Sequence, residues 1–322
     1  MNNGTTAIIG AGISGLLLAR SLADAGESVV VLEKSRGVGG RMSTKRVGDA
    51  VFDQGAQYFT ARESGFTALV EAWCGRGLAR NWPGSSHRRW VGCPSMTAVP
   101  KALAEGLEIL REHKVTAARR HTTGYWELDV EDHGLVRAER LVWACPVPQA
   151  LAVLRAGEVV LPAEVAASLE ALTYYPCLAL LVTLGGPSAV PVEGVALDEG
   201  PVRWIADNVK KGVAQTAAGA VTIHASAAYS SGHYASPVEE VAARLLPEVE
   251  RWLGGAVVVN TTLHRWKFSE PSNTHAERCV WLPDLGLGFV GDAFGGPKVE
   301  GAVLSGLALA ERLGAGAPTR SS

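Results

Sequence analysis

The feature that most constrains the fold is a glycine motif, G-x-G-x-x-G, at residues 10–15. A short run of apolar and β-branched residues precedes it at 5–9, and an apolar stretch from 14 to 25 follows it and predicts a helix. A second strand is predicted at 28–32. Two parallel strands need a crossover, so this order predicts a βαβ unit with the glycines at the turn between strand and helix.

The glycine motif predicts a bound dinucleotide. Its glycines allow a tight turn, close approach of a pyrophosphate and packing of the helix against the strand. The helix N-terminus adds N–H groups and the positive end of its dipole. Glu33 closes the second strand, near the offset of ~20 residues at which a carboxylate binds ribose hydroxyls, and it favours FAD or NAD over NADP because it would repel a 2′-phosphate. The residues predicted to contact the dinucleotide here are Gly10, Ala11, Gly12, Ser14, Gly15, Glu33 and Lys34.

Length and composition limit the remaining possibilities. At 322 residues the chain exceeds one typical domain of ~100–200 residues, so one large or two interleaved domains are expected. A formal net charge of -2 gives no electrostatic reason to bind nucleic acid. No apolar run reaches the ~20 residues of a membrane span and the start lacks a signal-peptide layout, so a cytoplasmic protein without a membrane partner is expected. The five cysteines lack a C-x-x-C spacing, which argues against zinc, iron–sulfur and dithiol sites and predicts buried thiols.

Several further elements are predicted along the chain. The clearest is a helix at 237–253, with Ser236 as its N-cap, Glu239 completing a capping box and Gly254 ending it. An inserted second domain is expected from 146 to 266. Other helices are predicted at 64–76 and 300–313, and strands at 50–53, 115–117, 125–130, 135–144, 177–184, 202–207, 220–226 and 288–291.

Two further motifs indicate that the dinucleotide is FAD. Residues 39–44, Gly-Gly-Arg-Met-Ser-Thr, resemble the second fingerprint of the two-dinucleotide-binding flavoproteins, in which Arg41 would lie near the pyrophosphate. Residues 286–293 resemble the motif with which such flavoproteins bind the ribityl chain, here through Asp292. The helix that follows would direct its N–H groups and dipole toward flavin N1 and the C2 carbonyl, where reduction places negative charge. These motifs add Gly40, Arg41, Asp292, Glu300, Gly301 and Ala302 to the predicted cofactor residues.

Together with the run at 52–62, these motifs give the chain a resemblance to the renalase group of flavoproteins, relatives of the flavin amine oxidases, over nearly its full length. Runs at 202–208, 264–268 and 297–302 strengthen the resemblance. It implies that Gln57 and Tyr58 line the flavin and that the backbone of Val115 contacts the adenine. It also implies a substrate side formed by Tyr58, Phe59, Thr60, Ala61, Met96 and Thr183.

The motifs and the resemblance together predict an α/β fold of two parts. A two-dinucleotide-binding, Rossmann-like FAD domain is expected over residues 1–75, 97–145 and 270–314, so it is discontinuous in the sequence. An inserted α+β substrate domain is expected over 76–96 and 146–269, and residues 315–322 are expected to form a disordered tail.

The expected reaction is an oxidation with oxygen as the final electron acceptor. The sequence has neither a second G-x-G-x-x-G nor a C-x-x-x-x-C, so neither a separate nicotinamide domain nor a disulfide reductase is indicated. The substrate should therefore give its electrons to flavin N5, with hydrogen peroxide as a product. The resemblance implies that the substrates are the 2- and 6-dihydro isomers of NAD(P)H, which would be oxidised to NAD(P)+. Hydride loss from a dihydropyridine removes no proton, so no general base and no catalytic side chain is predicted.

Two alternatives stay open. One is a flavin amine oxidase or another FAD-dependent dehydrogenase, although Val299 stands at a position where amine oxidases commonly carry an aromatic or bulkier pattern. The other is a non-catalytic flavin-binding protein. The pairs Gly55-Ala56 and Gly295-Gly296 argue against it because they suggest room near the ring. The oligomeric state also stays open. His224, His233, His264 and His275 could approach the cavity. Arg88, Arg89 and Arg203 could bind substrate phosphates or belong to a solvated face.

Overall fold

The computed structural model describes residues 4–83, 88–214 and 218–317, and it divides the chain into two compact units. Unit 1 comprises Met1–Gly40, Pro100–Thr173 and Pro271–Ser322, and unit 2 comprises Arg41–Val99 and Tyr174–Glu270. The chain therefore passes from one unit to the other four times along its length. The compact units differ from the predicted domains in two segments, since residues 41–75 lie in unit 2 and residues 146–173 lie in unit 1.

Packing explains both differences. The hairpin of β3 (Thr44–Val47) and β4 (Ala50–Asp53) packs against β15 (Ala220–Ala225), and its buried Phe52 shares a cluster with Leu181 and Ala220. Helix α4 (Val147–Ala156) packs against β8 (Val115–Arg120), which keeps residues 146–173 with unit 1. Each segment therefore belongs to the unit whose strands bury its apolar side chains.

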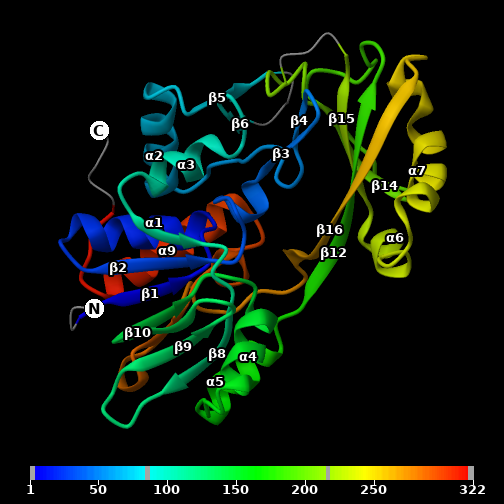
Figure 1. Cartoon of the computed structure of the whole chain (residues 1–322). Helices are drawn as coiled ribbons and strands as arrows, with labels where there is room; N and C mark the ends of the chain where they lie inside the picture. The colour runs from blue at the N-terminus through cyan, green and yellow to red at the C-terminus, as the bar shows by residue number, and fades with distance from the viewer. Residues whose placement is uncertain (1–3, 84–87, 215–217, 318–322) are drawn as a thin grey trace. The chain divides into compact units, whose positions relative to one another are not determined.

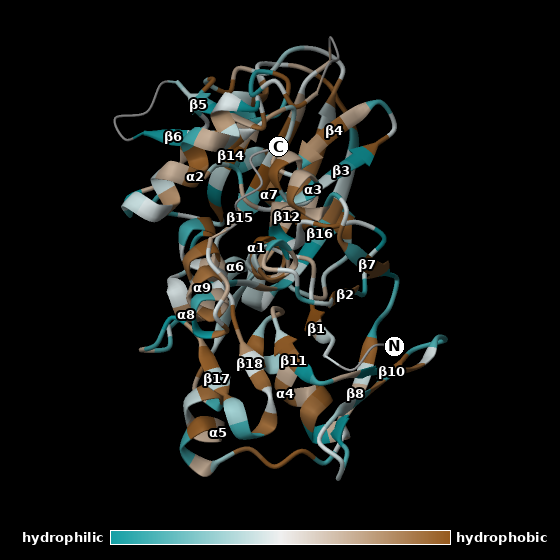
Figure 2. Ribbon diagram, turned by 90° about the vertical axis from the view of Figure 1, so that its left-hand side faces the viewer, coloured by the Kyte–Doolittle hydropathy of each residue, from teal (hydrophilic) through white to brown (hydrophobic). Residues whose placement is uncertain are grey.

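Unit 1 is built on a six-stranded sheet. All neighbouring strands in it run parallel except the edge pair β17 and β18, which is antiparallel. A mainly parallel sheet is covered on both faces, which explains the continuous hydrophobic burial of strands such as β1 and β11 (Figure 2). The strand order is β17 (Val280–Leu282), β18 (Leu287–Phe289), β11 (Arg140–Trp143), β1 (Thr6–Ile9), β2 (Val29–Glu33) and β7 (Glu108–Arg111).

Two helices from opposite ends of the chain lie side by side in unit 1. Helix α1 (Ile13–Asp24) packs against α9 (Val299–Arg312), as Figure 1 shows. A Cβ atom at Gly306 would lie 2.5 Å from the carbonyl oxygen of Ser14, so this close crossing requires glycine. The other elements of unit 1 are α3 (Ala98–Ala104, which begins in unit 2), β8, β9 (Trp126–Val130), β10 (Gly134–Ala138), α4, α5 (Ala163–Glu170), a 3-10 turn at Pro283–Leu285 and α8 (Asp292–Gly295).

Unit 2 is built on a five-stranded sheet covered by α7 (Val238–Leu253). The strand order is β13 (Val195–Ala196), β14 (Val202–Asp207), β15, β12 (Tyr174–Leu184) and β16 (Val258–Pro271). The apolar side of α7 buries Val241, Leu245 and Val249 against this sheet. The remaining elements are a 3-10 turn at Gly40–Met42, β3, β4, α2 (Ser64–Gly75), β5 (Ala79–Trp82), β6 (Arg89–Gly92) and α6 (Ala227–Gly232).

The predicted elements are confirmed to within a few residues at most of their ends, and the exceptions are instructive. The strand-like piece predicted at 135–144, in which residues 141–144 were expected to return to the first domain as a buried strand, is two strands. β10 and β11 separate at Glu139 and join different sheets. The prediction that Ser236 caps α7 is wrong, because Pro237 is the N-cap and no side chain caps this helix. Gly254 does end the helix, in the left-handed conformation at φ 69°.

The described part of the chain ends at residue 317, shortly after α9. Ala315, the first residue of the predicted disordered tail, is buried, and residues 318–322 lie outside the described residues. Within the described ranges, every helix is too short or too polar to cross a membrane.

Candidate functional site

The glycine motif forms a tight turn between β1 and α1 in unit 1. Gly10 has φ +113°, and a side chain on Gly15 would collide with the carbonyl oxygen of Gly10, so both positions require glycine. A Cβ atom on Gly12 would meet no atom within 4 Å. Gly12 is also the N-cap of α1, and no side chain caps that helix. The N-terminus of α1 is therefore open to an anion from the solvent side.

Glu33 lies beside this turn. Its side chain is buried, and its Oε2 accepts the Ala11 N–H at 2.8 Å while its Oε1 accepts the Ser35 N–H at 2.8 Å. Each carboxylate oxygen can accept more than one hydrogen bond, so the group is fixed in place and can still accept ribose hydroxyls. Lys34 points its exposed Nζ elsewhere, where it donates to Oε1 of Gln149 at 2.9 Å.

The start of β8 is held next to Glu33. The N–H of His113 donates to the carbonyl of Glu33 at 3.0 Å, and the N–H of Glu112 donates to the carbonyl of Ser35 at 3.2 Å. Val115 follows two residues later and is 7% exposed. A backbone contact from Val115 to a base attached to a ribose at Glu33 is compatible with this arrangement.

The C-terminal motif forms a second turn in the same unit. Strand β18 is followed by Gly291 at φ +146° and by the buried Asp292, which begins α8. The N–H of Gly291 donates to Oγ of Ser305 on α9 at 2.9 Å. No side chain caps α9, which begins at Val299 after Lys298, so a second helix N-terminus of unit 1 is left for a ligand group that accepts hydrogen bonds.

The glycines near this turn serve packing. A side chain on Gly295 would collide with the carbonyl of Gly301, and one on Gly301 would collide with the carbonyl of Gly296. Gly55 in unit 2 is similar, because a side chain there would collide with the carbonyl of Arg41. The interpretation as room beside the flavin ring is therefore wrong for Gly55 and Gly295, since close backbone contacts explain both, whereas a Cβ atom on Gly296 would meet no atom within 4 Å.

In unit 2, the segment from Asp53 to Tyr58 is held by hydrogen bonds along its length. Nε2 of Gln57 donates to the carbonyl oxygens of Asp53, at 2.6 Å, and Gly55, at 3.0 Å. The N–H of Ala56 donates to the carbonyl of Arg41 at 2.8 Å. Among the described residues Oε1 of Gln57 has no partner although it is buried, so it is a fixed acceptor for a ligand.

Asp53 anchors this segment to the rest of unit 2. Its carboxylate lies 2.8 Å from Nζ of Lys211, and both side chains are fully buried. Oδ1 also accepts the Thr44 hydroxyl at 2.7 Å and the Met96 N–H at 3.1 Å. Burial lowers the pKa of Lys211, and the charge of Asp53 opposes that shift. The pair thus depends on both partners, because either charge alone would be buried without compensation.

Three aromatic rings surround the end of the segment. The ring of Tyr58 lies 5.4 Å from that of Trp204 and 5.8 Å from that of Trp82, measured between centroids. The guanidinium of Arg89 lies 4.3 Å from the Tyr58 ring and 5.6 Å from the Trp204 ring, and Nζ of Lys211 lies 5.6 Å from the Trp82 ring. We call Tyr58, Trp82, Trp204 and Arg89 the aromatic cluster of unit 2.

Two histidines of unit 2 are neutral at pH 7. Burial lowers the pKa of His224 to about 4, and it lowers the pKa of His264 to about 4 as well. The carbonyl of Gln54 lies 3.2 Å from Nε2 of His224 and accepts Nε1–H of Trp266 at 3.0 Å. The ring of His264 packs edge-on against Trp266 at 4.2 Å. Both histidines therefore support the segment that carries Gln57 and Tyr58.

Two of the other predicted substrate residues, Phe59 and Met96, are buried. Phe59 is 3% exposed and packs among Phe66, Trp73 and Trp90, so its side chain belongs to the core. Met96 is 0% exposed, and its sulfur accepts the Gly92 N–H at 3.4 Å. Thr60, Ala61 and Thr183 are half-buried.

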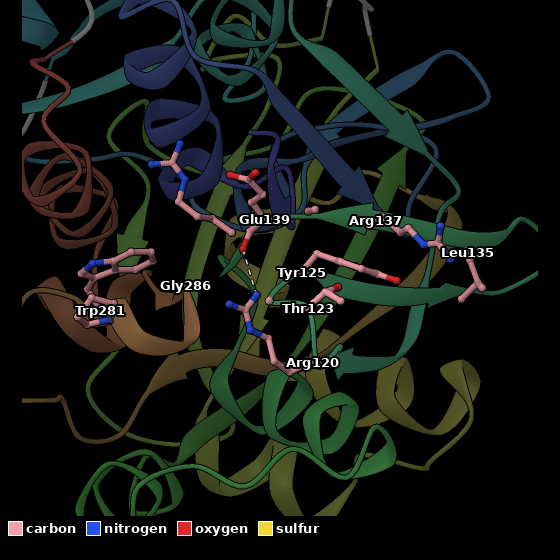
Figure 3. Close-up of a pocket in the computed structure, with 12 residues that line it drawn as sticks. Arg120, Thr123, Tyr125, Leu135, Arg137, Glu139, Trp281 and Gly286 are labelled. Carbon is pink, nitrogen blue, oxygen red and sulfur yellow. Dashed lines mark hydrogen bonds between the residues drawn. The ribbon is translucent and has the colours of Figure 1, made fainter. Parts of the chain in front are cut away.

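A separate hollow of about 990 Å³ lies in unit 1, at one end of β8, β9 and β10 (Figure 3). None of the predicted site residues lines it. Its arginines already have partners: Arg137 pairs with Glu127 at 2.9 Å, Arg140 contacts Glu27, and Arg120 donates to the carbonyl of Glu139 at 3.3 Å. The hollow therefore offers little unmatched charge to a ligand.

The predicted cofactor residues are thus divided between the two units. Unit 1 brings together Gly10, Ala11, Gly12, Ser14, Gly15, Glu33 and Val115 around one turn, and Asp292, Glu300, Gly301 and Ala302 around the other. Unit 2 holds Arg41, Gln57 and Tyr58, and Gly40 stands at the boundary. The open Gly12, the two uncapped helices and the buried Ser14 hydroxyl, which has no partner among the described residues, fit a dinucleotide such as FAD.

Sequence reasoning did not find Asp53, Lys211, Trp82 or Trp204. Trp204 lies in the run at 202–208 and Asp53 in the run at 52–62. Both runs contributed to the family resemblance, but neither residue was given a role. Lys211 and Trp82 gave no signal, because their contacts are formed with residues far away in the sequence.

Comparisons with known proteins agree with this arrangement. A model of NAD(P)-binding Rossmann-like domains matches residues 8–73, and a model of flavin-containing amine oxidoreductases matches residues 78–314. Putrescine oxidase from Kocuria rosea is 41% identical over 64 residues, which are 20% of this chain and only 13% of the length of that relative.

Solved structures show the same fold. Cyclohexylamine oxidase from Brevibacterium oxydans IH-35A superposes with a TM-score of 0.73 at 14% identity, covering 97% of this chain and 100% of that one. A wild-type putrescine oxidase bound to putrescine superposes with a TM-score of 0.72 at 15% identity, covering 97% and 99%. Because the amine oxidoreductase model alone matches more than half of the chain, the protein belongs to the flavin-containing amine oxidoreductase family, and its cofactor is FAD.

Proposed function

We propose that the protein is a FAD-dependent oxidase that takes hydride from the 2- and 6-dihydro isomers of NAD(P)H, as in the renalase group. The proposed partners are a dihydronicotinamide dinucleotide and oxygen. The cofactor residues would be those of the two turns of unit 1, together with Arg41, Gln57 and Tyr58 of unit 2. The N-terminus of α1 would bind the pyrophosphate of FAD, which is negatively charged. The N-terminus of α9 would face the flavin ring, which becomes negatively charged on reduction.

The reaction balances without a protein base. Bound FAD supplies a two-electron acceptor at N5. The dihydropyridine loses a hydride, and oxygen takes up the two electrons with that hydrogen and one proton from solvent, so that NAD(P)H, H+ and O2 give NAD(P)+ and H2O2. The side chains therefore need to bind and orient the substrate and to exclude water, and none has to remove a proton.

The observation that carries this proposal is the charge of the aromatic cluster. Amine substrates reach an enzyme mostly as ammonium ions, which are attracted by open aromatic faces and by carboxylates. Here the guanidinium of Arg89 already lies over Tyr58 and near Trp204, whereas the ammonium of Lys211 near Trp82 is balanced by Asp53. The carboxylate of Asp53 is already paired with Lys211. Such surroundings favour a neutral dihydropyridine on an anionic dinucleotide over an organic cation.

The neutral histidines fit the same proposal. With pKa values lowered to about 4, His224 and His264 are weak bases at neutral pH. They would hold the Gln54–Tyr58 segment in shape without titrating in the range where the enzyme works. This agrees with a reaction in which orientation matters and proton removal does not.

Amine oxidation is the second candidate. The family match and the local identity of 41% to putrescine oxidase favour it. That identity covers only 64 residues, 20% of this chain, so it says little about a shared substrate.

Anaerobic reduction of the bound flavin tests the proposal. The purified protein is mixed with the 2- and 6-dihydro isomers of NADH, with ordinary NADH and with putrescine, and the visible flavin absorption is followed. We expect fast bleaching by the isomers alone and recovery with peroxide formation when oxygen is admitted.

Other outcomes reject the proposal. Bleaching by putrescine alone would establish an amine oxidase. A flavin that none of these compounds reduces would favour a non-catalytic flavin-binding protein.

A further inference from the structure

Arg89, at the start of β6, lies over the ring of Tyr58 and near the ring of Trp204. Its side chain is half-buried, and its guanidinium carbon lies 4.3 Å from the Tyr58 centroid and 5.6 Å from the Trp204 centroid. Contact with ring faces uses the flat side of a guanidinium and leaves the N–H groups around its edge free to donate. The rings therefore orient this cation without consuming its hydrogen bonds.

No acidic side chain neutralises Arg89 among the described residues. Asp53 of unit 2 lies 2.8 Å from Nζ of Lys211, and its Oδ1 accepts the Thr44 hydroxyl and the Met96 N–H, so its charge is already paired. Arg203, another arginine of unit 2, shows the contrast, because Glu270 pairs with it at 3.3 Å.

Further basic side chains lie near the aromatic cluster, and the charge of one of them, Lys211, is balanced by Asp53. Nζ of Lys211 lies near the Trp82 ring, and the guanidinium of Arg80 donates to the Lys211 carbonyl at 2.5 Å. A half-buried cation with free donors, fixed by aromatic rings and next to further cations, is suited to bind an oxyanion such as a phosphate.

We infer that Arg89 is a specificity residue that binds the diphosphate of the dinucleotide substrate and disfavours amines. This inference rests on the proposed function and assigns one of its requirements, recognition of an anionic substrate, to a single side chain. The dihydropyridine would then be presented beside Tyr58, and an ammonium substrate would meet a fixed positive charge at the same place.

Ligand binding tests the inference without relying on turnover. The FAD-loaded protein is titrated with NAD+, which carries the diphosphate, and with nicotinamide riboside, which lacks it, and the change of the visible flavin spectrum gives a Kd. The variants are Arg89→Ala, Arg89→Lys and, as a matched control, Arg88→Ala, whose exposed side chain lies over Trp90 instead.

We expect Arg89→Ala to weaken NAD+ binding by about 10- to 100-fold, the range of a charge-assisted hydrogen bond. Arg89→Lys should keep part of the affinity because it keeps the charge. Nicotinamide riboside should bind all variants within about twofold, and Arg88→Ala should behave as the parent protein does. The NAD+ affinity of the parent should also fall as salt is raised.

Three results would overturn the inference. If Arg89→Ala and the parent protein bind NAD+ equally, Arg89 does not bind the diphosphate, whereas the proposed function stands. If Arg89→Ala weakens NAD+ and nicotinamide riboside alike while retaining its FAD, the residue only supports the cluster. If the parent protein binds no NAD+ and is not reduced by the dihydro isomers, the proposed function fails and the inference fails with it.

Discussion

The two units build their candidate binding residues in different ways. In unit 1 these are mostly backbone, beside the Glu33 carboxylate: glycines 10, 12 and 15 shape the turn, and the N-termini of α1 and α9 present main-chain N–H groups. In unit 2 they are side chains, which form a buried ion pair and the aromatic cluster. A backbone site tolerates changes of neighbouring side chains but not of its glycines, whereas a side-chain network depends on each partner.

The largest effect is expected from breaking the buried ion pair of unit 2. Lys211→Met should lower the free energy of unfolding by about 3–5 kcal/mol, because it leaves Asp53 buried without its counter-charge. The double variant Asp53→Asn with Lys211→Met should recover much of this loss, since no charge then stays unpaired. Urea unfolding measures both. Equal stability of Lys211→Met and the parent would mean that the side-chain network is dispensable.

A single methyl group should damage the backbone site of unit 1. Gly15→Ala forces a Cβ atom onto the carbonyl of Gly10, which should cost about 1–3 kcal/mol and reduce the flavin content of the purified protein. The control is Gly65→Ala in the first turn of α2, where a Cβ atom meets nothing within 4 Å. The ratio of flavin to protein absorption reports the result. Full flavin content in Gly15→Ala would contradict a site defined by the glycines.

Acid should weaken unit 2 through its buried histidine. In the unfolded chain a histidine takes up its proton near pH 6.5, whereas folded His224 does so only near pH 4. The stability that depends on neutral His224 is thus complete above pH 6.5 and is lost as the pH falls toward 4, by about 1.4 kcal/mol at pH 5.5. His224→Gln should flatten this dependence in unfolding curves, and His133→Gln, at an exposed position, should not. Unchanged acid sensitivity in His224→Gln would place the effect elsewhere.

The smallest effects distinguish a true helix cap from an apparent one. Oγ of Ser226 accepts the Tyr229 N–H at 3.3 Å at the start of α6, so Ser226→Ala should cost about 1 kcal/mol. Ser236 makes no such bond to α7, so Ser236→Ala should change stability by less than about 0.5 kcal/mol. Thermal unfolding of both variants checks the comparison, and a larger loss from Ser236→Ala would restore the capping box.

The contrast between the units also explains what the sequence predicts. Periodicity and glycine spacing are local properties, so they predicted the βαβ unit, including α1, and the position of Glu33. The aromatic cluster was only partly predictable: Tyr58 came from the resemblance, whereas Trp82 and Trp204 meet through contacts between positions more than 120 residues apart.

Two local interpretations failed for a related reason. Gly55 and Gly295 match an expectation of open space, but their role depends on which backbone lies opposite them, and this is set by tertiary packing. Ser236 carries the right side chain for a cap, but the helix begins one residue later than the capping rule requires. Substrate choice depends even less on local patterns, so it stays a proposal.

The chain order of unit 1 determines when it can assemble during synthesis. Strands β1 and β2 leave the ribosome first, but β18 and α9, which complete their sheet and cover α1, leave last. At typical translation rates that interval is roughly 15 to 60 s. Throughout it, the leucine-rich side of α1 is without its partner helix. The nascent protein therefore has to shield that helix, through chaperones or transient contacts, before its nucleotide-binding unit can close.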